Sequence, residues 1–181
     1  MHRICRQWIA SIIENHHDLL ALALVQRSKF EGWLKMELAA MAMKEGVKAL
    51  QLEVPILGSS GDRADIGFEY KGNKYILELK TPNTNWRLNG VENRMRPITK
   101  NIKSVVEDTK KLEGSPVYGI VAFALFPIPV DDIRWKTYVE RISQDTGIEI
   151  SEAEHCQIVR VPISDGQAAG ILICCYQVPS S

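Results

Sequence analysis

The sequence has little of what marks a secreted, membrane-spanning or disordered protein. Only 12 Gly and 8 Pro occur in 181 residues, and the four cysteines lack the CxxC spacing of zinc sites and the density of disulfide-rich domains. The most apolar stretch, residues 117–130, contains two prolines and is far shorter than the roughly 20 residues that cross a bilayer. These absences predict a single globular domain over residues 1–181, with buried thiols, in the cytoplasm and without membrane contact.

Net charge is also lacking, because 22 basic side chains balance 22 acidic ones, and this alone argues against a nucleic-acid-binding protein. The distribution of charge argues the other way. Residues 71–111 contain ten Lys or Arg and four acidic residues, whereas residues 131–181 contain four basic and eight acidic residues. This polarity fits a molecule with one face for a polyanion, although solvated helix charges produce the same pattern.

The hydrophobic periodicity predicts helices and strands in alternation. Ser28 and Glu31 form a capping-box pattern, which predicts a helix that ends before Gly46. The other expected elements are helices within residues 1–28, a strand at 50–56, a hairpin at 64–80, a helix at 98–112, a buried strand at 117–126, a helix at 131–145, and strands at 157–162 and 169–178. This order predicts an α/β domain with a mixed central sheet flanked by helices.

The predicted hairpin brings three charged side chains together. With a two-residue turn at Gly72–Asn73, Asp65 lies opposite Lys80, and Glu78 projects from the same face of the hairpin. The apolar side chains of both strands then cover the other face. A surface ion-pair ladder explains the three charges as well as a functional site does.

A further carboxylate falls on the apolar side of the helix that starts near Phe30. At about 100° per residue, Glu37 lies beside Trp33 in the predicted apolar stripe, whereas Glu31 is accounted for by the cap. A carboxylate in such a place is costly unless it is protonated, paired or bound to a cation. Together with Asp65 and Glu78 it would give three oxygen ligands, the set that Mg²⁺ prefers.

A helix with Glu37, a strand with Asp65 and, thirteen residues later, the Glu78-Leu79-Lys80 triplet on the next strand resembles the PD-(D/E)xK phosphodiesterase superfamily. That superfamily includes restriction endonucleases and many repair nucleases. Ala64 precedes Asp65 where the family pattern often has proline, a frequent departure in the superfamily.

The resemblance implies a restriction-endonuclease-like αβββαβ core over residues 29–126. Residues 1–28 are then an N-terminal helical elaboration, and residues 127–181 add a helix and strands at the C-terminal side.

The resemblance also implies the roles of individual residues. Asp65, Glu78, Glu37 and the backbone carbonyl of Leu79 would hold Mg²⁺ or Mn²⁺, and Lys80 would orient or help to deprotonate the attacking water. The implied activity is hydrolysis of phosphodiester bonds in DNA, with RNA left open as a substrate. Many such nucleases act as homodimers, and without a separate recognition domain either a partner protein or the loops supply targeting.

The segment that follows the triplet carries groups suited to a phosphate backbone. The candidates for nucleic-acid contact are Arg87, Arg94, Arg96, Lys100 and Lys103, with Trp86 for base stacking. A loop anchor packed on the core is the alternative for Trp86, and simple solvation is the alternative for the basic residues. Two other functions stay open: a nucleic-acid-binding or assembly module of the same fold without catalysis, and a structural domain whose charges are ion pairs.

Overall fold

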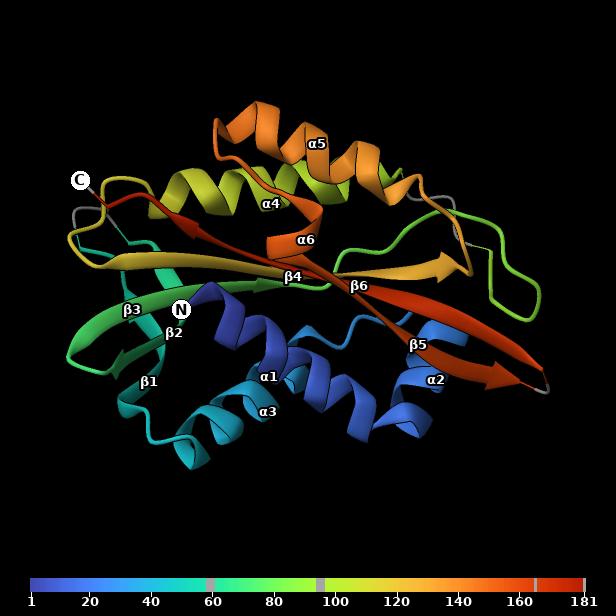
Figure 1. The fold of residues 1–181 in the computed structure, drawn as a ribbon, viewed down its shortest axis with the longest axis horizontal. Helices are drawn as coiled ribbons and strands as arrows, with labels where there is room; N and C mark the ends of the chain where they lie inside the picture. Colours follow the sequence, from blue (N-terminus) through green and yellow to red (C-terminus); the bar gives the residue numbers. More distant parts are fainter. Residues whose placement is uncertain (58–60, 94–96, 165, 181) are drawn as a thin grey trace.

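The computed structural model describes residues 1–57, 61–93, 97–164 and 166–180 (Figure 1). Its elements in chain order are α1 (His2–Asn15), α2 (His17–Gln26), α3 (Glu31–Lys44), β1 (Lys48–Pro55), β2 (Arg63–Tyr70), β3 (Asn73–Lys80), α4 (Ile98–Leu112), β4 (Tyr118–Pro129), α5 (Trp135–Thr146), α6 (Glu152–His155), β5 (Cys156–Ser164) and β6 (Gln167–Val178).

The six strands form one mixed sheet in the order β1-β2-β3-β4-β6-β5. Within the described parts of the chain, β3 and β4 are the one pair of neighbouring strands that runs parallel, and the other neighbours are antiparallel. Helix α4 makes the crossover between the two parallel strands, as the geometry of such a connection requires. The predicted α/β architecture with a mixed sheet flanked by helices is confirmed.

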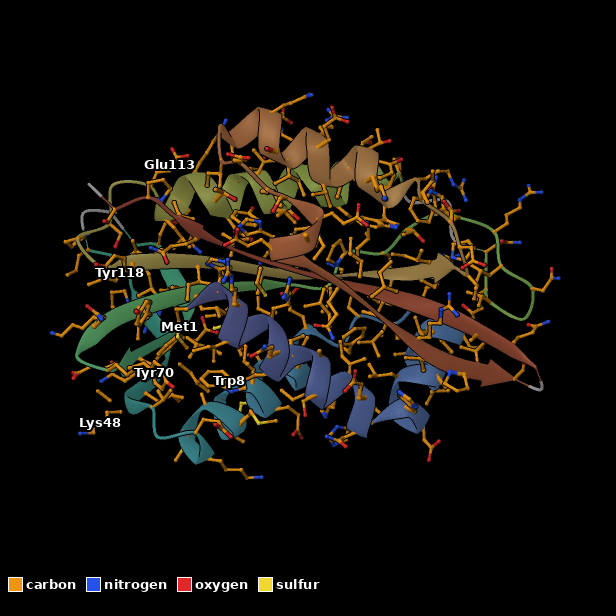
Figure 2. The ribbon with its side chains drawn as sticks, viewed as in Figure 1. Met1, Trp8, Lys48, Tyr70, Glu113 and Tyr118 are labelled. Atoms are coloured by element: carbon orange, nitrogen blue, oxygen red, sulfur yellow. The ribbon has the colours of Figure 1, made fainter. Side chains whose placement is uncertain are left out.

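Helices lie on both faces of the sheet. Figure 1 shows α1, α2 and α3 on one side and α4 with α5 on the other, and side chains fill the space between the sheet and each helical layer (Figure 2). Strand β4 is covered on both faces and is buried from its second to its eleventh residue, as its continuous apolar sequence predicts.

No helix among the described residues is long and apolar enough to cross a membrane.

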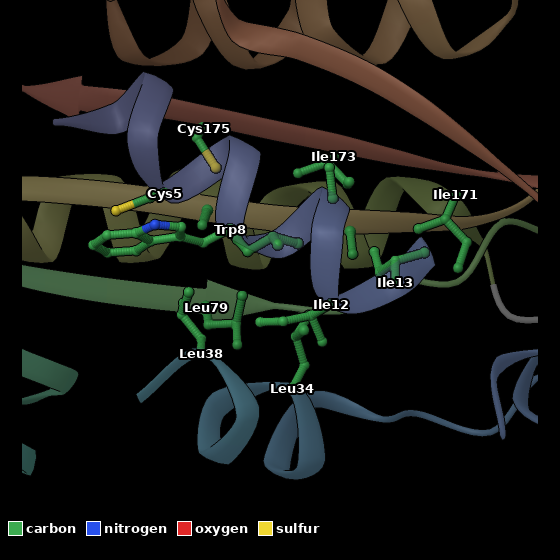
Figure 3. Close-up of a cluster of buried hydrophobic side chains, with 14 of the residues drawn as sticks. Cys5, Trp8, Ile12, Ile13, Leu34, Leu38, Leu79, Ile171, Ile173 and Cys175 are labelled. Carbon is green, nitrogen blue, oxygen red and sulfur yellow. The ribbon is translucent and has the colours of Figure 1, made fainter. Parts of the chain in front are cut away.

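The larger hydrophobic cluster joins α1 and α3 to the sheet. Trp8 and Ile12 of α1 lie near Leu34 and Leu38 of α3, and Leu79 of β3 points into the same cluster (Figure 3). Leu79 is fully buried. Because side chains alternate along a strand, its neighbours in the sequence must point to the opposite face, where α4 lies.

The turn of the β2–β3 hairpin differs from the prediction. The central residues are Lys71 and Gly72, with φ angles of 50° and 79°, and Tyr70 pairs with Asn73. A turn with positive φ at both central positions matches the right-handed twist of the strands, whereas the predicted Gly72–Asn73 turn was one residue too far along the chain. The register therefore shifts by two residues, which leaves the assignment of side chains to the two faces unchanged.

Gly67 of β2 provides a test of the packing between the outer strands. A Cβ atom at this position would lie 2.8 and 2.9 Å from the two γ-carbons of Val54 on β1. Because the branched Val54 side chain has little rotational freedom, we expect Gly67→Ala to lower the free energy of unfolding by about 1–3 kcal/mol. Urea unfolding of Gly67→Ala, Val54→Ala and the double variant measures this. The double variant should lose less free energy of unfolding than the two single variants lose together. Strict additivity of the two losses would contradict the contact between position 67 and Val54.

Candidate active site

The candidate site lies at the end of β3, between α3 and α4. Glu78 and Lys80 flank the buried Leu79 and point toward α4, where they meet Lys111 and Asp108. The alternation of the strand thus places an acid and a base in the layer between the sheet and the helix.

Asp65 joins this cluster from the neighbouring strand. The backbone pairing of β2 and β3 ends at Ile66 and Leu77, and beyond it Asp65 Oδ2 accepts a hydrogen bond of 2.8 Å from the backbone N–H of Leu79. The Asp65 carboxylate therefore accepts a hydrogen bond from β3 at the position where the backbone pairing of β2 and β3 would otherwise continue. Asp65 Oδ1 lies 3.2 Å from the ammonium of Lys35 on α3, which also pairs with Glu53.

Glu78 is the most deeply buried acid of the site. Only 2% of the residue is exposed, and Oε1 accepts a hydrogen bond from Lys111. Burial raises the pKa of Glu78 to about 7; Lys111 opposes the rise, and the nearby Asp108 and Asp65 add to it. Glu78 can therefore exchange a proton near neutral pH, which is the property of an acid placed for function.

Lys80 lies between two carboxylates. Its Nζ is 3.2 Å from Asp108 Oδ2 and 3.8 Å from Glu31 Oε1. Burial lowers the pKa of Lys80, but Asp108 and Glu31 outweigh burial, so that the pKa lies above its ordinary value. Burial also raises the pKa of Asp108, against the effect of Lys80. Lys80 is thus a cation at neutral pH.

The helix carboxylate that reaches this cluster is Glu31. Its Oε2 accepts a hydrogen bond of 3.0 Å from the backbone N–H of Thr81, directly after Lys80. Helix α3 begins at Glu31 and has Phe30 as its N-cap, without a side-chain capping bond. The predicted capping box with Ser28 is therefore wrong, and the carboxylate assigned to it points into the site.

The predicted position of Glu37 is wrong as well. The buried face of α3 is formed by Leu34, Leu38, Ala39 and Ala42. Glu31 lies at the centre of that face and Glu37 about 120° from it around the helix. Glu37 is partly exposed and makes no hydrogen bond or ion pair with a described residue. The prediction failed because it built the apolar stripe from Trp33, Leu34 and Met41, and Trp33 and Met41 are only partly buried.

Lysine side chains separate the four acids of the cluster. Among the described residues, no three of Glu31, Asp65, Glu78 and Asp108 bring carboxylate oxygens within 4.8 Å of one another. Instead Lys35, Lys80 and Lys111 each lie beside one or two of them. The donor set is made of oxygen atoms only, which suits a hard divalent cation, and such a cation would replace ammonium groups as the compensating charge.

The segment between β3 and α4 is fixed by one buried side chain. Arg27, at the end of α2, is 1% exposed and donates hydrogen bonds to the backbone carbonyls of Thr84, Trp86 and Glu92. These bonds satisfy carbonyl groups of an irregular segment, which pairs with β4 at its beginning through a bridge between Asn83 and Phe126. Nothing in the hydrophobic pattern of the sequence indicated this role for Arg27.

Trp86 is part of the core and does not have the exposure that base stacking needs. It is 5% exposed, lies near the ring of Tyr138, and has the Arg134 guanidinium 4.6 Å from its ring centroid. The prediction that Trp86 stacks on bases is corrected to the alternative reading, a loop anchor packed on the core.

The basic residues predicted to bind phosphate divide into two groups. Arg94 and Arg96 lie outside the described residues. Arg87, Lys100 and Lys103 are exposed. The two lysines also line a groove of about 530 Å³ between α4 and α5, together with Lys110 and Arg141. Asp145 also lines the groove and pairs with Arg141, so the lining keeps a net positive charge, which suits a polyanion.

Comparison of the chain with protein-family models, curated proteins and solved structures gives no match. The functional assignment therefore depends on the geometry and chemistry of the cluster around Glu78.

The raised pKa of Glu78 makes a prediction about stability. Because its pKa in the folded state lies above the unfolded value, the folded state binds more protons between pH 4.5 and about 7, and stability falls as the pH rises through this range. Glu78→Gln resembles the protonated acid at every pH. We expect it to be more stable than the wild type by about 1–3 kcal/mol at pH 8 and to differ little from it at pH 4.

Urea unfolding at the two pH values checks this expectation. Glu107→Gln, which changes an exposed acid on α4, is the matched control and should have little effect at either pH. A loss of stability in Glu78→Gln at pH 8 would show instead that the ion pair with Lys111 outweighs the cost of burying the carboxylate.

Proposed function

We propose that this protein hydrolyses phosphodiester bonds in DNA with the help of Mg²⁺ or Mn²⁺, at a site of the PD-(D/E)xK type. The observation that carries the proposal is the convergence of Asp65, Glu78 and Lys80 at the point where β2 and β3 stop pairing. Glu31 reaches the same place from α3. Glu78 is buried, and Asp65, Lys80 and Glu31 are partly buried. Charges taken out of water are costly, so four of them at one break in a sheet favour a functional site over a surface ion-pair ladder.

The order of elements supports the proposal. Helix α3, the antiparallel strands β1, β2 and β3, helix α4 and the parallel strand β4 follow one another along the chain. This is the αβββαβ order that the resemblance implies for the superfamily, and it places the acids of β2 and β3 beside both helices.

The metal ligands of the proposal are Asp65, Glu78 and the backbone carbonyl of Leu79, with Glu31 in place of Glu37. When bound, the cation supplies positive charge for the phosphate oxygens and lowers the pKa of a coordinated water. The oxygen-only donor set of the cluster fits such an ion.

The side chains of this chain have distinct tasks in the proposal. Lys80 stays protonated between Asp108 and Glu31, so it offers a cation to the phosphate rather than a base to the water. Glu78 has a pKa of about 7 in the absence of a cation, so it must lose its proton to serve as a ligand, and cation binding should weaken below that pH. Asp65 is held by the Leu79 amide and keeps its orientation on the strand.

The two glutamates of α3 give a sharp test of the site. We expect Glu31→Gln to lower the rate of DNA cleavage by about 10²–10³-fold, because it removes a charge beside Lys80 and the proposed metal position. Glu37→Gln, on the same helix but outside the cluster, should cleave at the wild-type rate. The assay follows plasmid and single-stranded DNA with Mg²⁺ or Mn²⁺ at equal protein concentrations, with Lys80→Ala as a third variant.

Equal cleavage by the wild type and Lys80→Ala would point to a contaminating nuclease and remove the basis of the proposal. DNA binding without cleavage by the wild type and all three variants would favour the second function left open by the sequence, a nucleic-acid-binding module without catalysis. Lys35, Lys80 and Lys111 support that alternative, because they already compensate the negative charge of the acids.

The basic groove between α4 and α5 makes a prediction about binding. If Lys100 and Lys103 contact phosphates, replacing both by Ala should weaken DNA binding and reduce the slope of log K against log[salt] by about 1.8 for duplex DNA. Among the residues that the structure describes, Lys103 pairs only with the exposed Glu107, so folding should be unaffected. Lys44→Ala, which changes an exposed lysine on α3, is the control. Fluorescence anisotropy at several salt concentrations measures the slope, and an unchanged slope in the double variant would exclude this groove as a DNA-binding surface.

A further inference from the structure

The N-terminal end of α1 is joined to α6, a segment about 150 residues away in the sequence. Arg6 donates hydrogen bonds of 2.6 and 3.1 Å to the backbone carbonyls of Glu154 and Cys156. Arg3 reaches the Glu154 carboxylate at 2.8 Å. These contacts hold the first turn of α1 against α6 and fix the positions of the side chains that project from both.

Three of these side chains carry metal-binding atoms. One ring nitrogen each of His2 and His155 and a carboxylate oxygen of Glu154 lie within 4.8 Å of one another, and this is the one such group of three among the described residues. The two imidazole rings are stacked, with centroids 5.0 Å apart. His2 Nε2 is 3.4 Å from Glu154 Oε1.

The ring nitrogens of the two histidines have different partners. Both ring nitrogens of His2 are shielded from solvent and have no hydrogen-bond partner among the described residues. Nδ1 of His155 faces both backbone groups of Ser151, whose N–H donates to it at 3.0 Å and whose carbonyl lies 3.2 Å away. Zinc at Nε2 requires the tautomer with its proton on Nδ1, which that carbonyl can accept. A backbone carbonyl behind a metal-binding histidine commonly fixes the tautomer in this way.

We infer that His2, Glu154 and His155 form a binding site for Zn²⁺. Two imidazoles and a carboxylate, with a fourth position for water beside the partly exposed Glu154, are a common ligand set for this ion. With bonds of about 2.0–2.2 Å, tetrahedral coordination of Zn²⁺ would place the ligand atoms about 3.3–3.6 Å from one another. The nitrogen ligands favour zinc over Mg²⁺, whereas the cluster at Glu78 offers oxygen ligands only.

This zinc site does not depend on the proposed nuclease activity. Its ligands lie on α1 and α6, and none belongs to the cluster around Glu78. Bound zinc would bridge the beginning of α1 to α6 and stabilise the folded chain, because the unfolded chain does not hold the three ligands together.

The test is a titration with ZnCl₂ of protein that carries no polyhistidine tag. The Asp65→Asn/Glu78→Gln background is used so that zinc cannot bind the acidic cluster. Calorimetry should give one Zn²⁺ per chain, and zinc at about 100 times Kd should raise Tm by about 5–10 °C. His155→Ala and His2→Ala should each weaken binding by at least about tenfold.

His17→Ala is the matched control, since His17 is a partly exposed histidine at the start of α2, outside the group of three, and it should bind zinc as the background protein does. Circular dichroism of each variant establishes that it is folded. The inference is overturned if the background protein binds no zinc, or if folded His2→Ala and His155→Ala both bind it with unchanged affinity and the same shift in Tm.

Discussion

The arrangement of the site depends on the burial of the Glu78 carboxylate. Leu79 belongs to the core beneath α1 and α3, so the strand must turn its two charged neighbours toward α4. The Glu78 carboxylate is only 2% exposed, so its charge must be compensated by a cation or removed by a proton. Lys111 provides the cation, and the raised pKa of Glu78 lets it bind the proton near neutral pH. The surrounding acids and lysines alternate for the same reason, because each buried charge requires an opposite one beside it.

Much of the fold could be predicted because it follows from local patterns. The alternation of apolar and polar residues gave the hairpin faces, which do not change when the register shifts by two residues. The helix predicted at 98–112 agrees with α4, and the apolar run from Val117 marks the buried β4. Helix α6, with only four residues, is too short to produce a periodic signal.

The errors arose where the tertiary structure decides the role of a residue. Glu31 matched a local capping pattern, yet its carboxylate bonds the backbone of Thr81, fifty residues away. Asp108 and Lys111 entered the sequence analysis only through the charge count of residues 71–111, although their spacing of three residues places them on one face of the helix. Trp86 and Arg27 look like ordinary surface or loop residues until the packing of the segment around them is known.

The hydrogen bonds of Arg27 also change how the N-terminal helices relate to the rest of the chain. One guanidinium at the end of α2 holds three carbonyl groups of the segment that leaves β3. A guanidinium keeps its charge over the whole pH range in which Glu78 titrates. The segment after β3 therefore stays in place while the charge of Glu78 varies with pH. Helices α1 and α2 are thus part of the structure that supports the site, rather than an addition to a core that is complete without them.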